Sequence, residues 1–298
     1  MFDSPLSASA YEVLGVAEDI DDDGLRRAYR IRLRETHPDT GGDAAAFIRV
    51  QYAWELIGTA EGRLAYDRGR DDEARLQWGG RSEPVRAGTR PRTASYGVAG
   101  AWRRARYLEL AHELSDAEGT DPYAPAFVRQ TPWELRRLLA DALAEEDTAR
   151  AMDDLGIGFT VWHGVEADGE PLDHVVLSPT GLYGLVSEDI GGPVGIRREE
   201  ITGPDGHGRM PVAELLSRLR AVSRAARVRF GGAILVFPDD DLAEPVVPLG
   251  VVSKVPVVAI RRSALRSLLR AGVPGVRIVG GTELFEIRSR LKQTLRTR

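Results

Sequence analysis

The chain contains no cysteine among its 298 residues, which excludes disulfide bonds, thiolate metal ligands and cysteine nucleophiles. Its five histidines are scattered and show no spacing typical of a metal site, so we expect neither a metal nor a cofactor. No apolar run approaches the roughly 20 residues that a membrane-crossing helix needs, so we expect no contact with a membrane. The first residues also lack the basic segment and apolar core of a signal peptide. These absences predict a soluble, cytoplasmic protein.

Lysine is almost absent as well, because Lys254 and Lys292 are the only lysines among 40 basic residues. The net charge of −5 hides a basic stretch from Arg81 to Arg106, which holds seven arginines and a single acid, Glu83. Such a stretch is typical either of a solvated linker or of a segment that contacts nucleic acid. The acidic charge of the whole chain favours the linker.

The composition divides the chain into three parts. Residues 1–70 are rich in helix-forming residues. Residues 71–128 are predicted to be a flexible basic linker rich in Gly, Pro and Arg, with a short amphipathic helix from Trp102 to Leu114. Residues 129–298 mix strand-like and helical patterns, as a second folded domain would. We therefore predict a helical domain, a linker and an α/β domain.

The first part has the pattern of an antiparallel helical hairpin. One helix is predicted from Asp21 to about Glu35, and it ends at His37-Pro38-Asp39 because a residue before proline is pushed out of the helical region. A second helix is predicted from Asp43 to Ile57, with its apolar residues at a spacing of three and four.

The first of these helices carries a basic face. Arg26, Arg30 and Arg34 are spaced by four residues and therefore lie in one row. Like charges at this spacing repel one another weakly, but an acidic partner surface would turn the row into a guide for docking. A solvated surface is the alternative interpretation.

The motifs of this region resemble the J domain of the DnaJ co-chaperone family, over residues 8–70. The matching motifs, in order, are Tyr11-x-x-Leu14-Gly15-Val16, Ala28-Tyr29, His37-Pro38-Asp39, Phe47, Ala53-Trp54-Glu55-Leu56 and Arg63-x-x-Tyr66-Asp67. The sequence departs from the family at Arg32, where leucine is usual, and at Trp54, where tyrosine is common. Neither departure touches the tripeptide.

This resemblance implies a partner and a set of contact residues. In the DnaJ family, the tripeptide and the basic helix before it engage a DnaK-type chaperone and stimulate its ATP hydrolysis. Carried over, His37, Pro38 and Asp39 would form the triggering loop. The docking face would consist of Arg26, Tyr29, Arg30 and Arg34. Because no Gly/Phe-rich segment or zinc-binding repeat is present, we expect the last part of the chain to select the client or target.

The pattern of residues 129–298 predicts a central mixed sheet covered by helices. Helices are expected over residues 131–156, 211–226, 263–271 and 282–295, the first of them capped by Thr131 and Glu134. Strands are expected over residues 159–163, 174–177, 182–186, 232–237, 251–260 and 276–279.

This domain also resembles, more loosely, the nuclease-related (NERD) domain with its restriction-endonuclease-like core. The resemblance rests on Glu145 or Glu146 in the first helix and on Asp173 before a strand. In active members, the aspartate and an acid-x-lysine pair hold a divalent metal and position a water molecule. Here the lysine position falls on Glu188, or on Ile190 in a shifted register, so Asp173 and Glu188 are expected to be remnants of a nuclease site.

The sequence thus favours one function and leaves another open. The favoured reading is a co-chaperone without enzymatic activity of its own, whose C-terminal domain serves as a targeting or binding module. The alternative is a metal-dependent nuclease that a J domain regulates.

Overall fold

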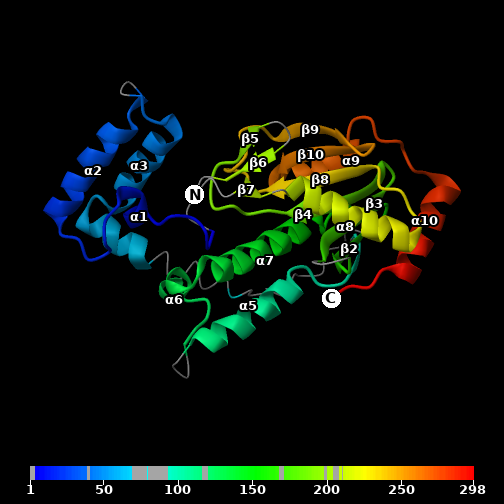
Figure 1. Cartoon of the computed structure of the whole chain (residues 1–298), viewed down its shortest axis with the longest axis horizontal. Coiled ribbons are helices and arrows are strands. Elements are labelled where there is room, and N and C mark those ends of the chain that lie inside the picture. The colour runs from blue at the N-terminus through cyan, green and yellow to red at the C-terminus, as the bar shows by residue number, and fades with distance from the viewer. Residues whose placement is uncertain are drawn as a thin grey trace. The chain divides into compact units, whose positions relative to one another are not determined.

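The computed structural model describes residues 4–38, 41–68, 79, 93–115, 120–167, 171–197, 200–203, 208–209 and 211–298 (Figure 1). Its internal contacts divide the chain into two compact units. Unit 1 comprises Met1–Glu83 and Ala117–Thr131, and unit 2 comprises Pro84–Asp116 and Pro132–Arg298. The prediction of a helical domain followed by a mixed-sheet domain is confirmed.

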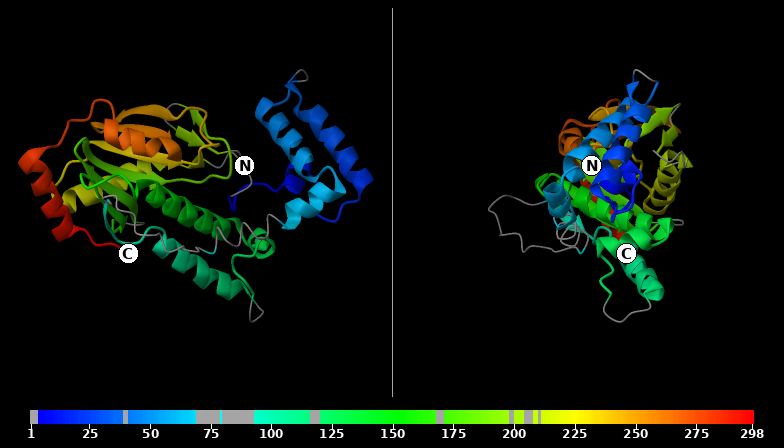
Figure 2. Two further views of the ribbon diagram at one scale, coloured as in Figure 1. Left: turned by 180° about the vertical axis from the view of Figure 1, so that it is seen from behind. Right: turned by 90° about the vertical axis from the view of Figure 1, so that its left-hand side faces the viewer.

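Unit 1 is helical. Its helices are α1 (Ala10–Leu14), α2 (Asp22–Thr36), α3 (Ala44–Ile57), a helix over residues 60–68 and α6 (Pro125–Gln130). The predicted pair of helices is present as α2 and α3, which lie side by side (Figures 1 and 2). Their shared core with α1 consists of Ala10, Tyr11, Leu14, Leu25, Val50, Ala53 and Ile57, all buried.

The bounds of α2 follow from local chemistry. Asp21 caps the first turn, because its carboxylate accepts a hydrogen bond of 2.8 Å from the backbone N–H of Gly24. At the other end, His37 has an extended backbone (ψ 128°), as expected for a residue that precedes proline. The helix therefore stops directly before the tripeptide.

Unit 2 is built on a seven-stranded mixed sheet. Its strands are β1 (Ala94–Tyr96), β2 (Thr160–Val165), β3 (Leu172–Ser178), β4 (Gly181–Ser187), β8 (Gly232–Phe237), β9 (Val246–Val252) and β10 (Val255–Arg261). The strand order is β1-β2-β3-β4-β8-β10-β9. The pairs β1–β2, β4–β8 and β8–β10 are parallel, and the others are antiparallel. A separate small sheet contains β5 (Gly195–Arg197), β6 (Glu200–Thr202) and β7 (Gly208–Arg209).

Helices cover both faces of the large sheet (Figure 2). On one face, α8 (Pro211–Ala226) and α10 (Gly281–Thr294) contribute Leu215, Leu219 and Ile287 to the core. On the other face, α7 (Trp133–Met152) and α9 (Leu265–Ala271) contribute Met152 and Leu269. The short helix η2 (Arg262–Ala264) leads into α9. The unit therefore has three layers, helix–sheet–helix.

Three details of this unit differ from the sequence-based expectation. The single strand predicted at 251–260 is a hairpin of β9 and β10, because Ser253 and Lys254 adopt positive φ and form a two-residue turn. Residues 276–279 form no strand. Thr131 does not cap α7, because its hydroxyl donates to the carbonyl of Val128 instead.

The structure also divides the chain differently from the predicted boundaries at 70 and 128. The helix predicted at 102–114 is present as α5 (Ala101–Leu114), but it packs on α7 and belongs to unit 2. The strand β1 pairs with β2 in the large sheet. Both elements lie within the predicted linker, and their pairing with distant segments gives no local sequence signal. Most of the remaining linker residues lie outside the described ranges.

Among the described residues, no helix combines the length and the apolar character that a membrane crossing requires. The cytoplasmic location stays a prediction.

Candidate functional site

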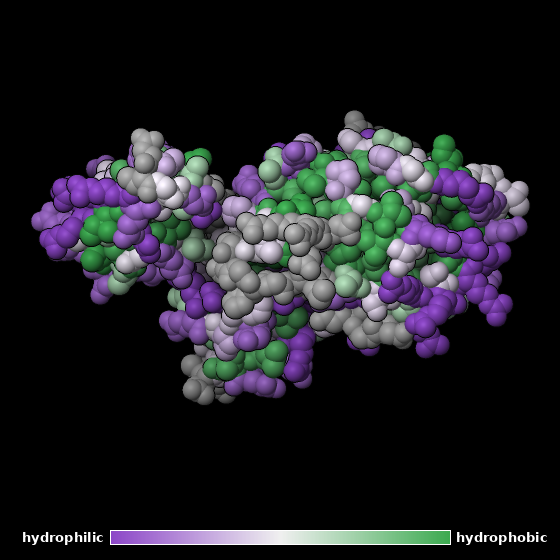
Figure 3. All heavy atoms as spheres, turned by 45° about the horizontal axis from the view of Figure 1, so that its top comes forward, coloured by the Kyte–Doolittle hydropathy of each residue, from purple (hydrophilic) through white to green (hydrophobic). Residues whose placement is uncertain are grey.

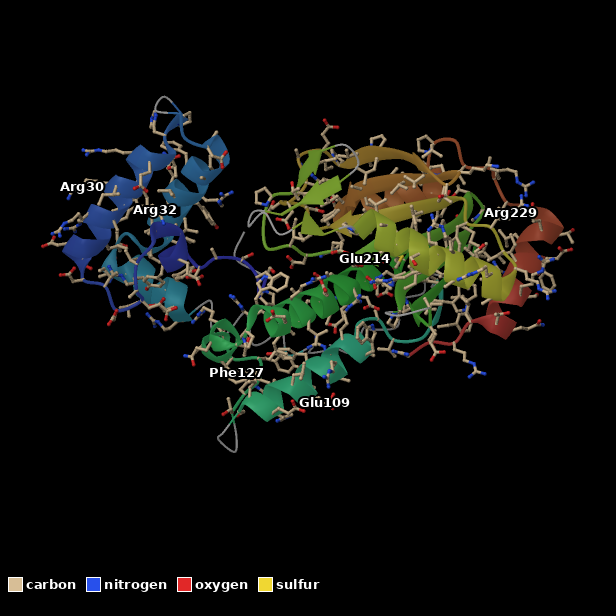
Figure 4. The ribbon with its side chains drawn as sticks, viewed as in Figure 1. Arg30, Arg32, Glu109, Phe127, Glu214 and Arg229 are labelled. Carbon is tan, nitrogen blue, oxygen red and sulfur yellow. The ribbon has the colours of Figure 1, made fainter. Side chains whose placement is uncertain are left out.

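The predicted basic face is exposed on α2. Arg26, Arg30 and Arg34 all lie on the surface, in the last three turns before the tripeptide. Arg26 has an acidic neighbour one turn earlier, Asp23, at 3.7 Å, but both side chains are largely exposed. Arg30 lies on the outer side of the helix (Figure 4), and hydrophilic residues cover much of the visible face of unit 1 (Figure 3). Exposed pairs of this kind contribute little to stability, so this pair would not prevent Arg26 from contacting a partner.

Tyr29 differs from the other predicted docking residues in its surroundings. It is half-buried, and its ring stacks on Trp54 of α3 with a centroid separation of 4.4 Å and an angle of 11°. The pair therefore joins α2 to α3. Trp54, which stands where tyrosine is common in the DnaJ family, therefore keeps an aromatic partner for Tyr29.

The start of the tripeptide is anchored to α3. The rings of His37 and Phe47 are nearly perpendicular, with a centroid separation of 5.0 Å. The carbonyl oxygens of His37 and Pro38 accept hydrogen bonds of 3.0 Å from the backbone N–H groups of Gly42 and Gly41. A side chain at Gly42 would collide with the backbone of Thr36, which explains glycine there. Pro38 is exposed, and Asp39 lies outside the described residues.

The unusual Arg32 is accommodated at the surface. Its guanidinium lies against Gly15, beyond the end of α1, and donates a hydrogen bond of 3.3 Å to Glu35 (Figure 4). The side chain thus reaches an acid instead of the core, which is how a long basic residue replaces leucine at the edge of a core.

The last motif of the resemblance holds the end of unit 1 in place. The hydroxyl of Tyr11 donates to the carboxylate of Asp67 at 3.1 Å, and the hydroxyl of Tyr66 accepts from the backbone of Ala10 at 3.0 Å. Arg63 donates to the carbonyl of Ile20 and to Asp22, both at 2.8 Å. These bonds join the helix over residues 60–68 to the first part of the unit, and they support the geometry of the basic face indirectly.

In unit 2, the structure brings one predicted nuclease remnant, Asp173, together with Glu145, on which the NERD resemblance also rests. Glu145 of α7 and Asp173 of β3 both contact Nη1 of Arg103 on α5, at 2.5 and 2.9 Å. Burial alone would lower the pKa of Arg103, but Asp173 and Glu145 raise it well above its usual value. Burial and the nearby Asp173 raise the pKa of Glu145 to about 8. Sequence reasoning missed Arg103 because it was assigned to the linker.

The second remnant, Glu188, is buried close to the same cluster. Burial raises its pKa, and Asp141 and Asp173 add to the effect. Within the described ranges, no group of three or more acids and histidines has the geometry to hold a metal ion. The arginine fills the space between Glu145 and Asp173, so these residues do not fit a divalent metal. The NERD resemblance itself stays a prediction.

Some arginines of the basic stretch form ion pairs inside unit 2. Arg104 forms two hydrogen bonds with Glu146 of α7, at 2.6 and 2.7 Å, and Arg106 pairs with Glu109 on its own helix. With Arg103, three of the seven arginines therefore have acidic partners within the chain. The arginines at 81, 86, 90 and 92 lie outside the described residues, and contact with nucleic acid stays a prediction.

Comparison with known proteins assigns unit 1. The model of the DnaJ domain matches residues 9–67. "Chaperone protein DnaJ 1" of Cutibacterium acnes is 38% identical over 73 residues, which cover 24% of this chain and 19% of that protein. "Tetratricopeptide repeat and J domain-containing co-chaperone DNJ1" of Mycosarcoma maydis is 37% identical over 87 residues, 28% of this chain and 15% of that protein. "Chaperone protein DnaJ" of Oleidesulfovibrio alaskensis is 44% identical over 62 residues, 20% of this chain and 16% of that protein.

The chain therefore spans less than a fifth of the length of each of these relatives. The match ends where the predicted resemblance ends, close to residue 70. The aligned motifs, the helical fold and the match agree, and we conclude that residues 9–67 of this chain form a DnaJ domain.

Proposed function

We propose that the chain is a co-chaperone that docks on a DnaK-type chaperone through α2 and the loop at His37-Pro38-Asp39, and stimulates its ATP hydrolysis. The observation that carries this proposal is the exposed row of Arg26, Arg30 and Arg34, which leads directly to the tripeptide of a DnaJ domain. Like charges at this spacing repel one another weakly within the helix. The row becomes favourable when an acidic partner surface meets it.

The tripeptide acts in this proposal as a switch for the partner. A chaperone with two conformations is shifted by a ligand that binds one of them better. His37 is held by Phe47 and by the backbone of Gly42, so the loop presents a fixed start to the partner. No step of this action requires chemistry on a substrate by this chain, and we therefore propose a protein that is not an enzyme.

Unit 2 is proposed to select the target. It has its own core and a fold unrelated to the helices of the DnaJ domain. One relative is named for both tetratricopeptide repeats and a J domain, so a J domain joined to a second module has a precedent. The identity of the target follows from what unit 2 binds.

Charge reversal on α2 tests this docking proposal. The full chain with Arg30→Glu should need about tenfold more protein for half-maximal stimulation of a DnaK-type ATPase, because a repulsive contact replaces an attractive one. A tenfold change corresponds to about 1.4 kcal/mol. Raising the salt concentration should narrow the difference between wild type and variant.

Arg106→Glu provides the matched control. Arg106 is an exposed arginine on a helix, like Arg30, but it belongs to α5 of unit 2. This variant should stimulate as the wild type does. Equal losses in both variants would show that only the net charge matters, and the assignment of the docking face to α2 would be wrong.

A further inference from the structure

One guanidinium in unit 2 holds two buried carboxylates from different elements. Nη1 of Arg103 lies 2.5 Å from Oε2 of Glu145 and 2.9 Å from Oδ1 of Asp173. These partners are 42 and 70 residues away from Arg103 in the sequence. The contact therefore joins α5, α7 and β3 at a single point.

The site is closed to solvent. The exposed fraction is 3% for Arg103, 0% for Glu145 and 1% for Asp173. A cation between two carboxylates at this depth favours their ionised forms and draws the two acids together. The guanidinium of Arg103 occupies this place, within hydrogen-bond distance of both acids.

The surroundings add to the negative charge. Asp141 and Glu188 are buried nearby, and Arg137 lies 3.5 Å from Asp141. Oε1 of Glu145 is buried and has no hydrogen-bond partner in the described structure. This oxygen of Glu145 is therefore left for a further ligand.

Asp173 is oriented independently of the arginine. Its second oxygen, Oδ2, accepts a hydrogen bond of 2.8 Å from the backbone N–H of Ser187 on the neighbouring strand. This bond fixes the carboxylate while Oδ1 accepts from Arg103. Carboxylates fixed in this way are typical ligands of hard divalent cations as well as of guanidinium.

We propose that Arg103 is the built-in cation of a carboxylate site formed by Glu145 and Asp173. It holds the two acids together as a divalent ion would, and it closes the site to such ions in the wild-type chain. The inference concerns unit 2 and does not depend on the co-chaperone proposal.

A second ion pair between α5 and α7 allows Arg103 to be replaced as a test. Arg104 holds Glu146 through two hydrogen bonds, so α5 stays attached to α7 when Arg103 is replaced. The full chain with Arg103→Met keeps most of the apolar stem and loses the charge. Its thermal unfolding is to be measured in metal-free buffer and with Mn²⁺ or Mg²⁺, beside the wild type and the matched variant Arg106→Met on the exposed side of the same helix.

We expect three results for these chains. The midpoint temperature of thermal unfolding should be the same with and without Mn²⁺ or Mg²⁺ for the wild type and for Arg106→Met. The midpoint of Arg103→Met should be lower in metal-free buffer and should rise by several degrees with Mn²⁺, because an ion that binds only the folded state stabilises it. The double variant Arg103→Met/Asp173→Asn should lose this rise.

Other outcomes overturn the proposal. An equal rise in the wild type would show that the arginine does not close the site, and no rise in folded Arg103→Met would show that the acids are not a cation site. If Arg103→Met fails to fold without metal, refolding in Mn²⁺ becomes the measurement. Recovery of the folded state then supports the proposal, and failure to recover overturns it.

Discussion

At the scale of single residues, two buried histidines of unit 2 form a pair. Nδ1 of His163 and Nδ1 of His174 lie 2.8 Å apart. The outer ring nitrogens face the hydroxyls of Ser95 and Ser187, at 2.8 and 3.3 Å. Only one proton fits between the two Nδ1 atoms, so at least one ring is a neutral imidazole. The chain of bonds connects β1, β2, β3 and β4.

These histidines should make the protein less stable in acid. Burial lowers the pKa of His163 to about 4, and burial together with His163 lowers the pKa of His174. The unfolded state therefore binds more protons below the ordinary histidine pKa of about 6.5, and folding weakens as the pH falls from there toward 4. Lowering the pH from 7 to 5.5 should reduce the free energy of unfolding by about 1 kcal/mol through His163 alone.

Urea unfolding at both pH values measures this effect. The variant His163→Gln should lose about 1 kcal/mol less than the wild type on going from pH 7 to 5.5. His112→Gln, on the exposed side of α5, is the control and should follow the wild type. Glu145 and Asp141 have raised pKa values and act in the opposite direction, which is why the difference between variants is the quantity to compare. Identical pH dependences in all three chains would contradict the account.

Residue roles were predictable from the sequence only where they depend on near neighbours. The exposed arginines of α2 and the stop before Pro38 follow from helical spacing and from the proline itself. The role of Arg103 depends on partners 42 and 70 residues away, and no local pattern announces such contacts. The stacking of Tyr29 on Trp54 was missed for a similar reason, since it joins two helices.

At the scale of elements, helices were predicted more faithfully than strands. The spacing of apolar residues places α8 at 211–226, as observed, because one buried face repeats with the helical period. The strands β3 and β4 are buried on both faces, so they lack the alternation of a half-buried strand. The turn at Ser253 and Lys254 was missed because apolar residues continue on both sides of it, in 251–252 and 255–260.

That turn leads to a prediction about the β9–β10 hairpin. Lys254 has a φ of 68°, in the left-handed region, where a Cβ atom is unfavourable and glycine is not. Lys254→Gly should raise the free energy of unfolding by about 1 kcal/mol, whereas Lys254→Ala should not, since alanine keeps the Cβ atom. Urea unfolding of both variants distinguishes the two cases. An equal change in both would trace the effect to the lysine side chain and not to the backbone.

At the scale of the whole molecule, the chain combines a DnaJ domain with a second unit that has its own hydrophobic core. The DnaJ domain occupies residues 9–67, and the mixed sheet with its helices makes up most of unit 2. Composition alone separated the two folds, but it misplaced α5 and β1, whose partners are distant in the sequence. This arrangement accords with a protein that brings a chaperone to whatever unit 2 binds.

The central claim is that this chain drives ATP hydrolysis by a DnaK-type chaperone, and single-turnover hydrolysis by that chaperone tests it most directly. The full chain should accelerate hydrolysis in proportion to its occupancy, and His37→Gln should abolish the acceleration while its circular dichroism spectrum stays that of the wild type. The ring of His37 contacts Phe47 of α3, and the spectrum checks that its replacement leaves the fold intact. No acceleration by the folded wild-type chain, or equal acceleration by His37→Gln, would contradict the account.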